Sequence, residues 1–211
     1  KEEAERLVSL GECAYFSTKY QEFGEGKVKA KALDDRVGCA LAIRLLQDTY
    51  PFPLVAAFTV QEEVGLRGAG VATYQVKPDI ALVLEGTTAS DVPGTDDHKH
   101  ATSLGQGPAI TVMDRTSIPH PPLVQELFSL AEDEGIKVQV RRNTAGGTDA
   151  GQIQMSEAGV KVATIAVPCR YIHSPVSVLS KTDYEGAYQL IKGYLKRLQE
   201  RGVAYLGTIT D

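Results

Sequence analysis

Short apolar runs alternate with amphipathic segments along most of the chain. Continuous apolar runs of strand length predict strands covered on both faces, at 54–60, 79–86, 109–114 and 161–168. A strictly alternating run predicts a half-exposed strand at 137–142. Apolar residues at helical spacing predict helices over 37–50, 122–135, 148–159 and 181–200. Strands that alternate with helices predict a layered α/β sheet.

Two local patterns refine this prediction. In the last helix, Thr182 and Glu185 have the spacing of a capping box, so we expect Thr182 to cap it. The first thirty residues differ from the rest: "KEEAERLVSLGE" reads as a charged helix, and "AYFSTKYQEFGEGKVKAKA" has the character of a hairpin. We therefore expect two units, a small subdomain over 1–28 and the main domain over 29–211.

Composition narrows the class of protein. The chain has 211 residues, of which 43% are hydrophobic and 23% charged, as in an ordinary globular domain. The net charge is −5 without a basic cluster, which argues against nucleic-acid binding. No apolar run approaches the roughly 20 residues of a membrane span. Three cysteines do not form a disulfide framework, and the charged start is no signal peptide, so we expect a cytoplasmic protein.

Acidic side chains collect where the predicted strands end. Glu62 and Glu63 follow the run 54–60, Glu85 closes the run 79–84, and His173 follows the run 161–168. Asp34 and Asp35 precede the first long helix. In open α/β sheets ligands bind beyond the carboxyl ends of the strands, so we expect these groups to converge there. Several carboxylates with one imidazole suit a divalent transition metal, typically Zn²⁺.

Each of these residues also has a simpler interpretation. Asp34 has the position of a helix N-cap, and Glu62 and Glu63 have that of a solvated strand end. Glu85 before a glycine suits a turn, and His173 suits a hydrogen-bonded loop. The "HKH" at 98–100 lies in a polar loop and reads as solvated. Only the joint arrangement favours a metal site.

Five segments together resemble the tetrahedral aminopeptidases, a family that includes glutamyl and deblocking aminopeptidases. They are "KALDDRVGCALAI", "TVQEEVGLRGA", "LVLEGTTASDVPG", "NTAGGTDAGQIQ" and "VPCRYIHSP", and the resemblance covers nearly the whole chain. It implies a three-layer α/β/α fold with a central mixed, mostly parallel sheet. It also implies a cytosolic exopeptidase with two divalent metal ions, Zn²⁺ or Co²⁺, that removes amino-terminal residues from peptides.

The resemblance also assigns roles to residues. Asp34 would bridge the two metal ions, with the peptide bond after it in the cis form. Glu63 and His173 would complete one metal site, and Glu85 would bind the other ion. Glu62 would be the general base that takes a proton from the attacking water. Relatives form dodecameric tetrahedra, which implies a homo-oligomer.

One expected feature is missing. The family's other metal-binding histidine lies near the amino terminus, whereas the four histidines here are at 98, 100, 120 and 173. The first 28 residues resemble the end of the family's inserted oligomerisation domain and the return segment, so the chain looks like the carboxyl-terminal portion of such an enzyme. We therefore expect one tightly held ion, with His98 or His100 the available substitutes for the missing ligand.

Two other functions remain open. One is an inactive or assembly-only form that keeps the fold but not the chemistry. The other is a glycoside hydrolase that uses Glu62 and Glu63 as its carboxylate pair, although such carboxyls flank the sugar bond roughly 5 to 9 Å apart, which adjacent residues do not easily achieve.

Overall fold

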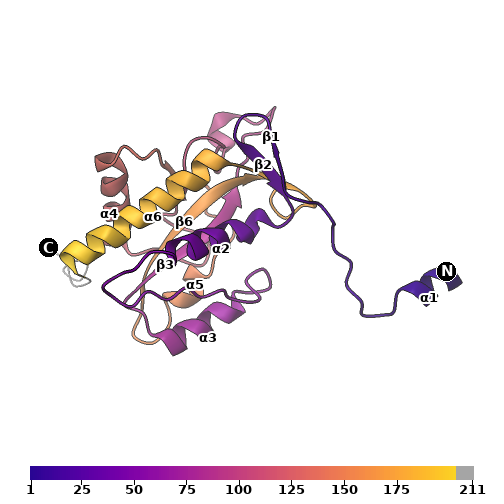
Figure 1. Ribbon diagram of the computed structural model, residues 1–211, viewed down its shortest axis with the longest axis horizontal. Helices are drawn as coiled ribbons and strands as arrows, with labels where there is room; N and C mark the ends of the chain where they lie inside the picture. The colour runs from indigo at the N-terminus through magenta and orange to yellow at the C-terminus, as the bar shows by residue number, and fades with distance from the viewer. Residues whose placement is uncertain (203–211) are drawn as a thin grey trace.

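The computed structural model describes residues 1–202. Strand β6 (Lys161–Arg170) lies at the centre of the protein (Figure 1). Within these residues a seven-stranded sheet has the order β1-β2-β7-β6-β4-β5, and β3 pairs with β6. The strands are β1 (Gln21–Phe23), β2 (Lys27–Ala30), β3 (Ile80–Thr88), β4 (Ala109–Ile110), β5 (Gln139–Val140), β6 and β7 (Ser177–Ser180). The helices are α1 (Glu2–Leu7), α2 (Leu33–Leu45), α3 (Arg67–Val76), η1 (Asp97–Lys99), α4 (Pro121–Asp133), α5 (Ala150–Ile153) and α6 (Lys181–Arg201).

The sheet is mixed, and the prediction that it is mostly parallel was wrong. The parallel pairs are β3 with β6 and β4 with β5, whereas β1–β2, β2–β7, β4–β6 and β6–β7 are antiparallel. Parallel neighbours in sequence need a crossover, usually a helix, and α4 supplies one between β4 and β5. The short return from β6 to β7 contains no helix, so these strands run in opposite directions.

Helices cover both faces of the sheet. Alternate residues of β6, from Ala163 to Cys169, face a large core made with α2, α4 and α6. The other face of β6, at Val162, packs with Val83 and with Ala150 of α5 in a smaller core, and α3 packs on α5. Because successive strand residues point to opposite faces, one apolar strand serves both cores. The three-layer α/β/α arrangement that the resemblance implied is therefore present.

Helix α6 follows the predicted amphipathic pattern. Its buried residues recur at helical spacing and include Ala187, Leu190, Ile191, Tyr194, Leu195 and Leu198. The predicted capping box is not formed, because Ser180, two residues before Thr182, is the N-cap of the helix. Glu185 instead accepts two hydrogen bonds from Arg44 of α2, at 2.6 and 3.2 Å, and so ties the two helices together.

The run 54–60 is not a strand. The apolar pattern predicted one, but no strand among residues 1–202 pairs with it. Val55, Phe58 and Val60 have 59%, 53% and 67% of their surface exposed. A strand is defined by its hydrogen-bonded neighbour, and the segment 54–60 has none among residues 1–202. The predicted elements at 109–114, 137–142 and 148–159 are present but shorter, as β4, β5 and α5.

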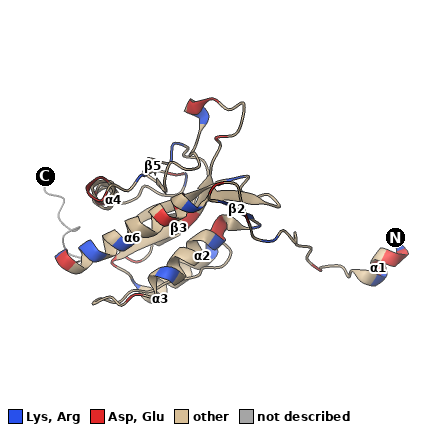
Figure 2. Cartoon of the chain, turned by 45° about the horizontal axis from the view of Figure 1, so that its top comes forward, with Lys and Arg blue, Asp and Glu red and all other residues tan. Residues whose placement is uncertain are grey.

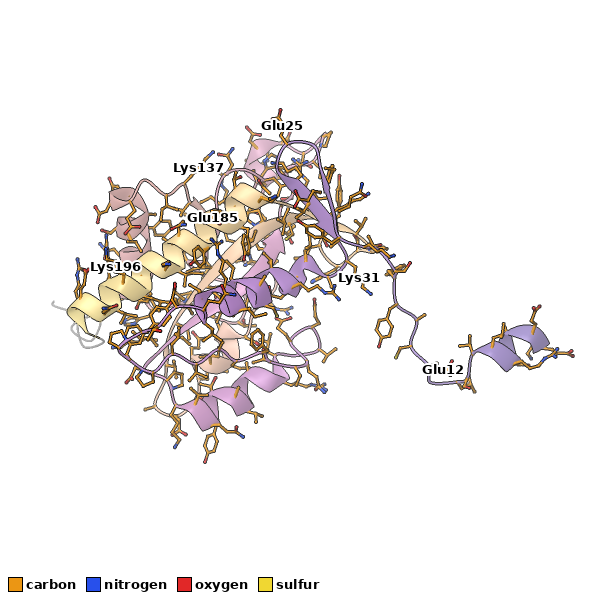
Figure 3. All side chains as sticks on the ribbon, in the orientation of Figure 1. Glu12, Glu25, Lys31, Lys137, Glu185 and Lys196 are labelled. Atoms are coloured by element: carbon orange, nitrogen blue, oxygen red, sulfur yellow. The ribbon has the colours of Figure 1, made fainter. Side chains whose placement is uncertain are left out.

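The first twenty residues project from the body as an arm (Figure 1). Helix α1 buries none of its residues, and Glu12 lies on the extended stretch that follows it (Figure 3). The β1–β2 hairpin then joins the main sheet, because β2 pairs with β7. Lys31 lies where the hairpin leads into α2 (Figure 3).

Basic and acidic residues both occur along α6 (Figure 2). Cys13, Cys39 and Cys169 are free thiols. Among residues 1–202 no helix is long and apolar enough to cross a membrane.

Candidate metal and catalytic site

Asp34 lies at an irregular start of α2. Ala32 before it has a left-handed backbone, and Asp34 and Asp35 are non-helical within the assigned helix. The peptide bond between the two aspartates is cis, which confirms the expectation from the resemblance. The Asp34 side chain reaches the carboxyl half of β3, where a Cβ on Gly86 would lie 2.9 Å from the Cβ of Asp34. A glycine at position 86 therefore makes room for this aspartate beside the strand.

A tight loop presents the two adjacent glutamates. The amide of Gly68 donates to the carbonyl of Val60 at 2.9 Å, which closes the loop, and a Cβ on Gly68 would lie 2.5 Å from that oxygen. Within the loop, Leu66 donates to the carbonyl of Glu62 at 2.9 Å. Glu62 is half-buried and Glu63 is exposed, so the two carboxylates meet different surroundings.

One group of ligands combines an imidazole with two carboxylates. Nε2 of His173 lies 3.2 Å from Oδ2 of Asp34 and 3.2 Å from Oε2 of Glu63. His173 sits in a left-handed backbone conformation just after β6. Zn²⁺ in a tetrahedral site places such ligands about 3.4 Å apart, since its bonds to nitrogen and oxygen are about 2.0–2.2 Å. The three side chains therefore fit a small divalent cation with one position left over.

A second group contains carboxylates alone. Asp34, Asp35 and Glu85 each offer an oxygen, and these oxygens lie within 4.8 Å of one another. Asp34 belongs to both groups, as a bridging ligand would. The sequence singled out Asp34 and Glu85 but gave no role to Asp35. Asp35 directly follows Asp34 in the sequence, yet only the fold shows that its side chain lies near Glu85.

Burial and mutual repulsion raise the pKa values of this cluster. Burial, followed by the charge of Glu63, raises the pKa of Asp34 to about 6. Burial is also the main cause for Asp35, whose pKa is raised to about 8. Burial and Glu63 raise the pKa of Glu62 to about 7. Burial and the two aspartates hold the pKa of Glu85 well above its usual range.

Two further polar residues lie close to the cluster. Thr59 donates a hydrogen bond to Oδ2 of Asp149 at 2.5 Å, while Oδ1 of Asp149 is buried without a partner among residues 1–202. Arg141 donates to the hydroxyl of Thr87 at 3.2 Å and interacts electrostatically with Glu85. Sequence reasoning assigned no role to Asp149 or Arg141, although Asp149 lies within the segment "NTAGGTDAGQIQ".

A cavity of about 310 Å³ opens beside the imidazole-containing group. Asp34, Glu63 and His173 line one part of it, and Tyr15 and Phe16 of the arm line another. Space for a substrate therefore adjoins the candidate ligands. A smaller, polar cavity of about 140 Å³ lies elsewhere and contains none of them.

The other histidines lie outside both ligand groups. His98 is in η1, and Nε2 of His100 lies 3.1 Å from the carbonyl of Thr95. His120 is the N-cap residue of α4. Neither His98 nor His100 is in a position to supply the missing imidazole, so the sequence-based suggestion that one of them replaces it is not supported within residues 1–202.

Comparisons with known proteins agree on one family. The model of the M42 glutamyl aminopeptidase family matches residues 1–190. The glutamyl aminopeptidase of Lactococcus lactis is 33% identical over 208 residues, which are 96% of this chain and 57% of that protein. The chain therefore spans little more than half the length of this curated relative.

Solved structures show the same likeness. The aminopeptidase APDkam598 from the archaeon Desulfurococcus kamchatkensis has a TM-score of 0.92 and 36% identity, over 100% of this chain and 60% of that one. The TET1 peptidase of Pyrococcus horikoshii, which can assemble into a tetrahedron or a large octahedral shell, has a TM-score of 0.76 and 33% identity, over 92% and 57% of the two chains. This chain belongs to the M42 glutamyl aminopeptidase family.

Proposed function

We propose that this protein is a metal-dependent aminopeptidase that hydrolyses the first peptide bond of peptides with a free amino terminus. The observation that carries the proposal is the contact of His173 with both Asp34 and Glu63 at 3.2 Å. A cavity lies beside these three side chains, and Glu62 directly precedes Glu63 in sequence. Family membership supports dependence on a divalent metal.

Asp34, Glu63 and His173 would hold the ion of the first site. A divalent ion there, Zn²⁺ or Co²⁺, would polarise the scissile carbonyl and favour ionisation of water. Asp34 is partly buried, while Glu63 and His173 are exposed, so the site is open to solvent rather than enclosed. That arrangement leaves access for a substrate from the cavity.

Glu62 would move the proton. It adjoins a ligand, is half-buried, and has a pKa raised to about 7 by burial and by Glu63. A carboxylate of this kind accepts a proton from water near neutral pH and can return it to the departing amine. Because Glu63 contacts His173 as a ligand would, Glu62 is the member of the pair that is free for this role.

A turnover assay tests the proposal. The metal-stripped chain is supplied with Zn²⁺ or Co²⁺ and offered an aminoacyl anilide and its N-acetylated counterpart. We expect release from the free amine only, and loss of release with EDTA. No release at any metal concentration favours the assembly-only alternative. Release of reducing sugar from a polysaccharide, with none from the anilide, favours a glycoside hydrolase.

We also propose that the protein acts as a homo-oligomer. The likeness to the TET1 peptidase, which can assemble into a tetrahedron, supports this. Sedimentation of the purified chain gives the mass of the assembly, and a monomer at all concentrations would contradict it for this chain.

A further inference from the structure

The smaller cavity, of about 140 Å³, has basic and polar walls. One wall is the segment 100–106, which precedes β4, and the other is the segment 137–142, which contains β5. His100, Lys137 and Arg142 line the cavity, and no acidic side chain of residues 1–202 does. A concave surface whose charged groups all have one sign attracts ligands of the opposite sign. The composition of the walls therefore favours an anion.

Gln139 holds the two walls of this cavity together. Its Oε1 accepts a hydrogen bond from the amide of Ser103 at 2.9 Å. Its Nε2 donates to the carbonyl of Ser103 at 3.0 Å and to that of Gly107 at 2.7 Å. The backbone adds a further link, because the amide of Arg142 donates to the carbonyl of Ala101 at 3.0 Å. These hydrogen bonds fix the distance between the walls, so the cavity is formed before a ligand binds.

Lys137 and Arg142 keep most of their hydrogen-bond donors unused. Nζ of Lys137 donates to the carbonyl of Gly105 at 3.0 Å, and Nη1 of Arg142 donates to the carbonyl of Asp97 at 3.2 Å. Within residues 1–202 neither side chain forms an ion pair with a carboxylate. A lysine ammonium group has three donor hydrogens and an arginine guanidinium group has five. Both residues can therefore donate charge-assisted hydrogen bonds to an anionic oxygen.

His100 and Ser103 form a polar pair on the same wall. Nε2 of His100 lies 3.1 Å from the carbonyl of Thr95, which can only accept, so Nε2 carries a hydrogen. Nδ1 of His100 lies 3.3 Å from the hydroxyl of Ser103. A proton on Nδ1 would reverse this hydrogen bond and leave the hydrogen of the Ser103 hydroxyl free. The pair can thus supply a positive charge and one further donor to an anion.

Two carboxylates lie near the walls but do not neutralise them. Oδ1 of Asp97 lies 4.0 Å from Nδ1 of His100, but the side chain of Asp97 is fully exposed, so solvent screens its charge. Asp183 interacts electrostatically with Lys137 from behind the wall. The oxygens of Asp183 accept hydrogen bonds from two backbone amides at 2.7 and 2.8 Å, and no bond joins them to the ammonium group of Lys137. The spare donors of Lys137 therefore stay available.

The size of the cavity limits the ligand to a small group. A volume of about 140 Å³ is close to the roughly 150 Å³ of an engineered protein cavity that holds one benzene molecule. It is smaller than the roughly 300–1,000 Å³ of sites that take drug-sized ligands. A phosphate group is within this limit, and arginine, lysine and hydroxyl groups are its usual partners.

We propose that this cavity binds a phosphate group, which Lys137 and Arg142 hold by charge-assisted hydrogen bonds. The group belongs either to inorganic phosphate or to a small phosphate ester whose remainder stays outside the cavity. None of the candidate metal ligands lines this cavity, so the inference does not depend on the proposed aminopeptidase activity.

Calorimetric titration tests the inference. The 211-residue chain is titrated with inorganic phosphate and, separately, with glycerol phosphate, in EDTA so that no metal ion binds the ligand. The ionic strength is kept constant, because salt screens exposed charges. We expect saturable binding of one phosphate group per chain. Binding of inorganic phosphate alone indicates a site for the free ion, and binding of both compounds indicates a site for esters; either result supports the inference.

Two variants and a matched control locate the bound group. Arg142→Gln and Lys137→Gln are each expected to weaken phosphate binding at least about tenfold, because each loses a charged donor. Both side chains are exposed, so circular dichroism of the variants should match that of the parent. Lys137 lies near the start of α6 and Lys196 near its end (Figure 3). Lys196→Gln removes the same charge away from the cavity and should bind phosphate as the parent does.

Three results would overturn the inference. The first is the absence of saturable phosphate binding by the parent chain. The second is unchanged binding in both Arg142→Gln and Lys137→Gln. The third is equal weakening in Lys196→Gln, which would mean a general attraction to positive charge rather than a site. If one cavity variant folds abnormally, the other provides the same test.

Discussion

Oδ2 of Asp34 lies 3.2 Å from Nε2 of His173, although 139 residues separate them in sequence. This contact joins the start of α2 to the segment after β6, so the first site is assembled by the fold itself. Because a ligand that binds only the folded state stabilises it, we expect Zn²⁺ to raise the free energy of unfolding by about 2.7 kcal/mol at a hundredfold excess over its Kd. Thermal unfolding with and without Zn²⁺ measures this. The His173→Ala chain should show no such increase, and an equal increase would place the ion elsewhere.

Replacement of Glu62 separates proton transfer from metal binding. In Glu62→Gln we expect kcat for an aminoacyl anilide to fall by about 10²–10⁴, because the amide cannot accept a proton. Metal content, measured by mass spectrometry, should stay that of the parent, since Glu62 belongs to neither ligand group. Glu132→Gln, a change on the exposed surface of α4, is the matched control. Near-parental turnover in Glu62→Gln would assign the base to another residue.

The acidic cluster predicts an unusual pH dependence for the metal-free protein. The folded-state pKa values of Asp34, Glu62 and Asp35 are raised to about 6, 7 and 8. The folded state therefore holds protons that the unfolded chain has already released, and unfolding liberates them. The contribution of these groups to stability is present at about pH 4 and is lost as the pH rises toward 8.

Unfolding in the presence of EDTA, followed from pH 5.5 to 8.5, checks this trend. We expect the midpoint temperature to fall as the pH rises, and saturating metal ion to flatten the dependence because it replaces the protons. A metal-free protein that becomes steadily more stable toward pH 8.5 would show that the cluster is not desolvated in this way.

Two glycines in helices offer a matched test of packing. In Gly38→Ala the added methyl group would overlap Leu84 and Asp35, so we expect a loss of about 1–3 kcal/mol in the free energy of unfolding. In Gly70→Ala of α3 the nearest atom, Oε1 of Gln152, would lie at an ordinary 3.6 Å, and helix propensity should add up to about 1 kcal/mol. Urea titration compares the two, and equal effects would contradict the close approach of α2 to β3.

An ion pair between α4 and α6 is a separate stabilising contact. Arg197 donates to Glu126 at 2.9 Å and to Asp133 at 2.6 Å, and the side chains of Arg197 and Glu126 are each only 14% exposed. In Arg197→Met we expect a loss of about 2–3 kcal/mol, because Glu126 loses its main donor at a poorly solvated position. Lys196→Ala, an exposed neighbour on α6 (Figure 3), is the control and should stay within about 0.5 kcal/mol of the parent. A result for Arg197→Met as small as that of Lys196→Ala would mean that solvent screens the pair.

Local pattern predicted helices α2, α4 and α6 and the longest strands, but it missed helix α3. The spacing in α6 and α4 and the apolar runs of β3 and β6 depend on burial, which the order of residues records directly. Strand direction was harder, because whether β7 runs against β6 depends on the path of the connection between them. The prediction of a strand over 54–60 was wrong for a related reason, since apolar residues form a strand only where a neighbouring strand exists.

Part of the candidate site could also be predicted from the sequence. Asp34, Glu63 and His173 could be named from their positions beside predicted helices and strands and from the family resemblance, and the fold brings them together. Asp35 was named beside Asp34 but was given no role, because its place near Glu85 depends on the close contact of α2 with β3 at Gly38. Asp149 and Arg141 depend likewise on contacts across the sheet that no local pattern records.

The exposed run 54–60 has a practical consequence for colloidal behaviour. This segment lies outside the sheet, and its exposed Val55, Phe58 and Val60 favour the addition of further chains as strands. The isolated chain should thus lose monodispersity as its concentration rises, by edge-to-edge growth that starts from this segment. A lysine in place of Phe58, whose side chain already meets water, would act as a gatekeeper against that growth and leave the ligand groups untouched.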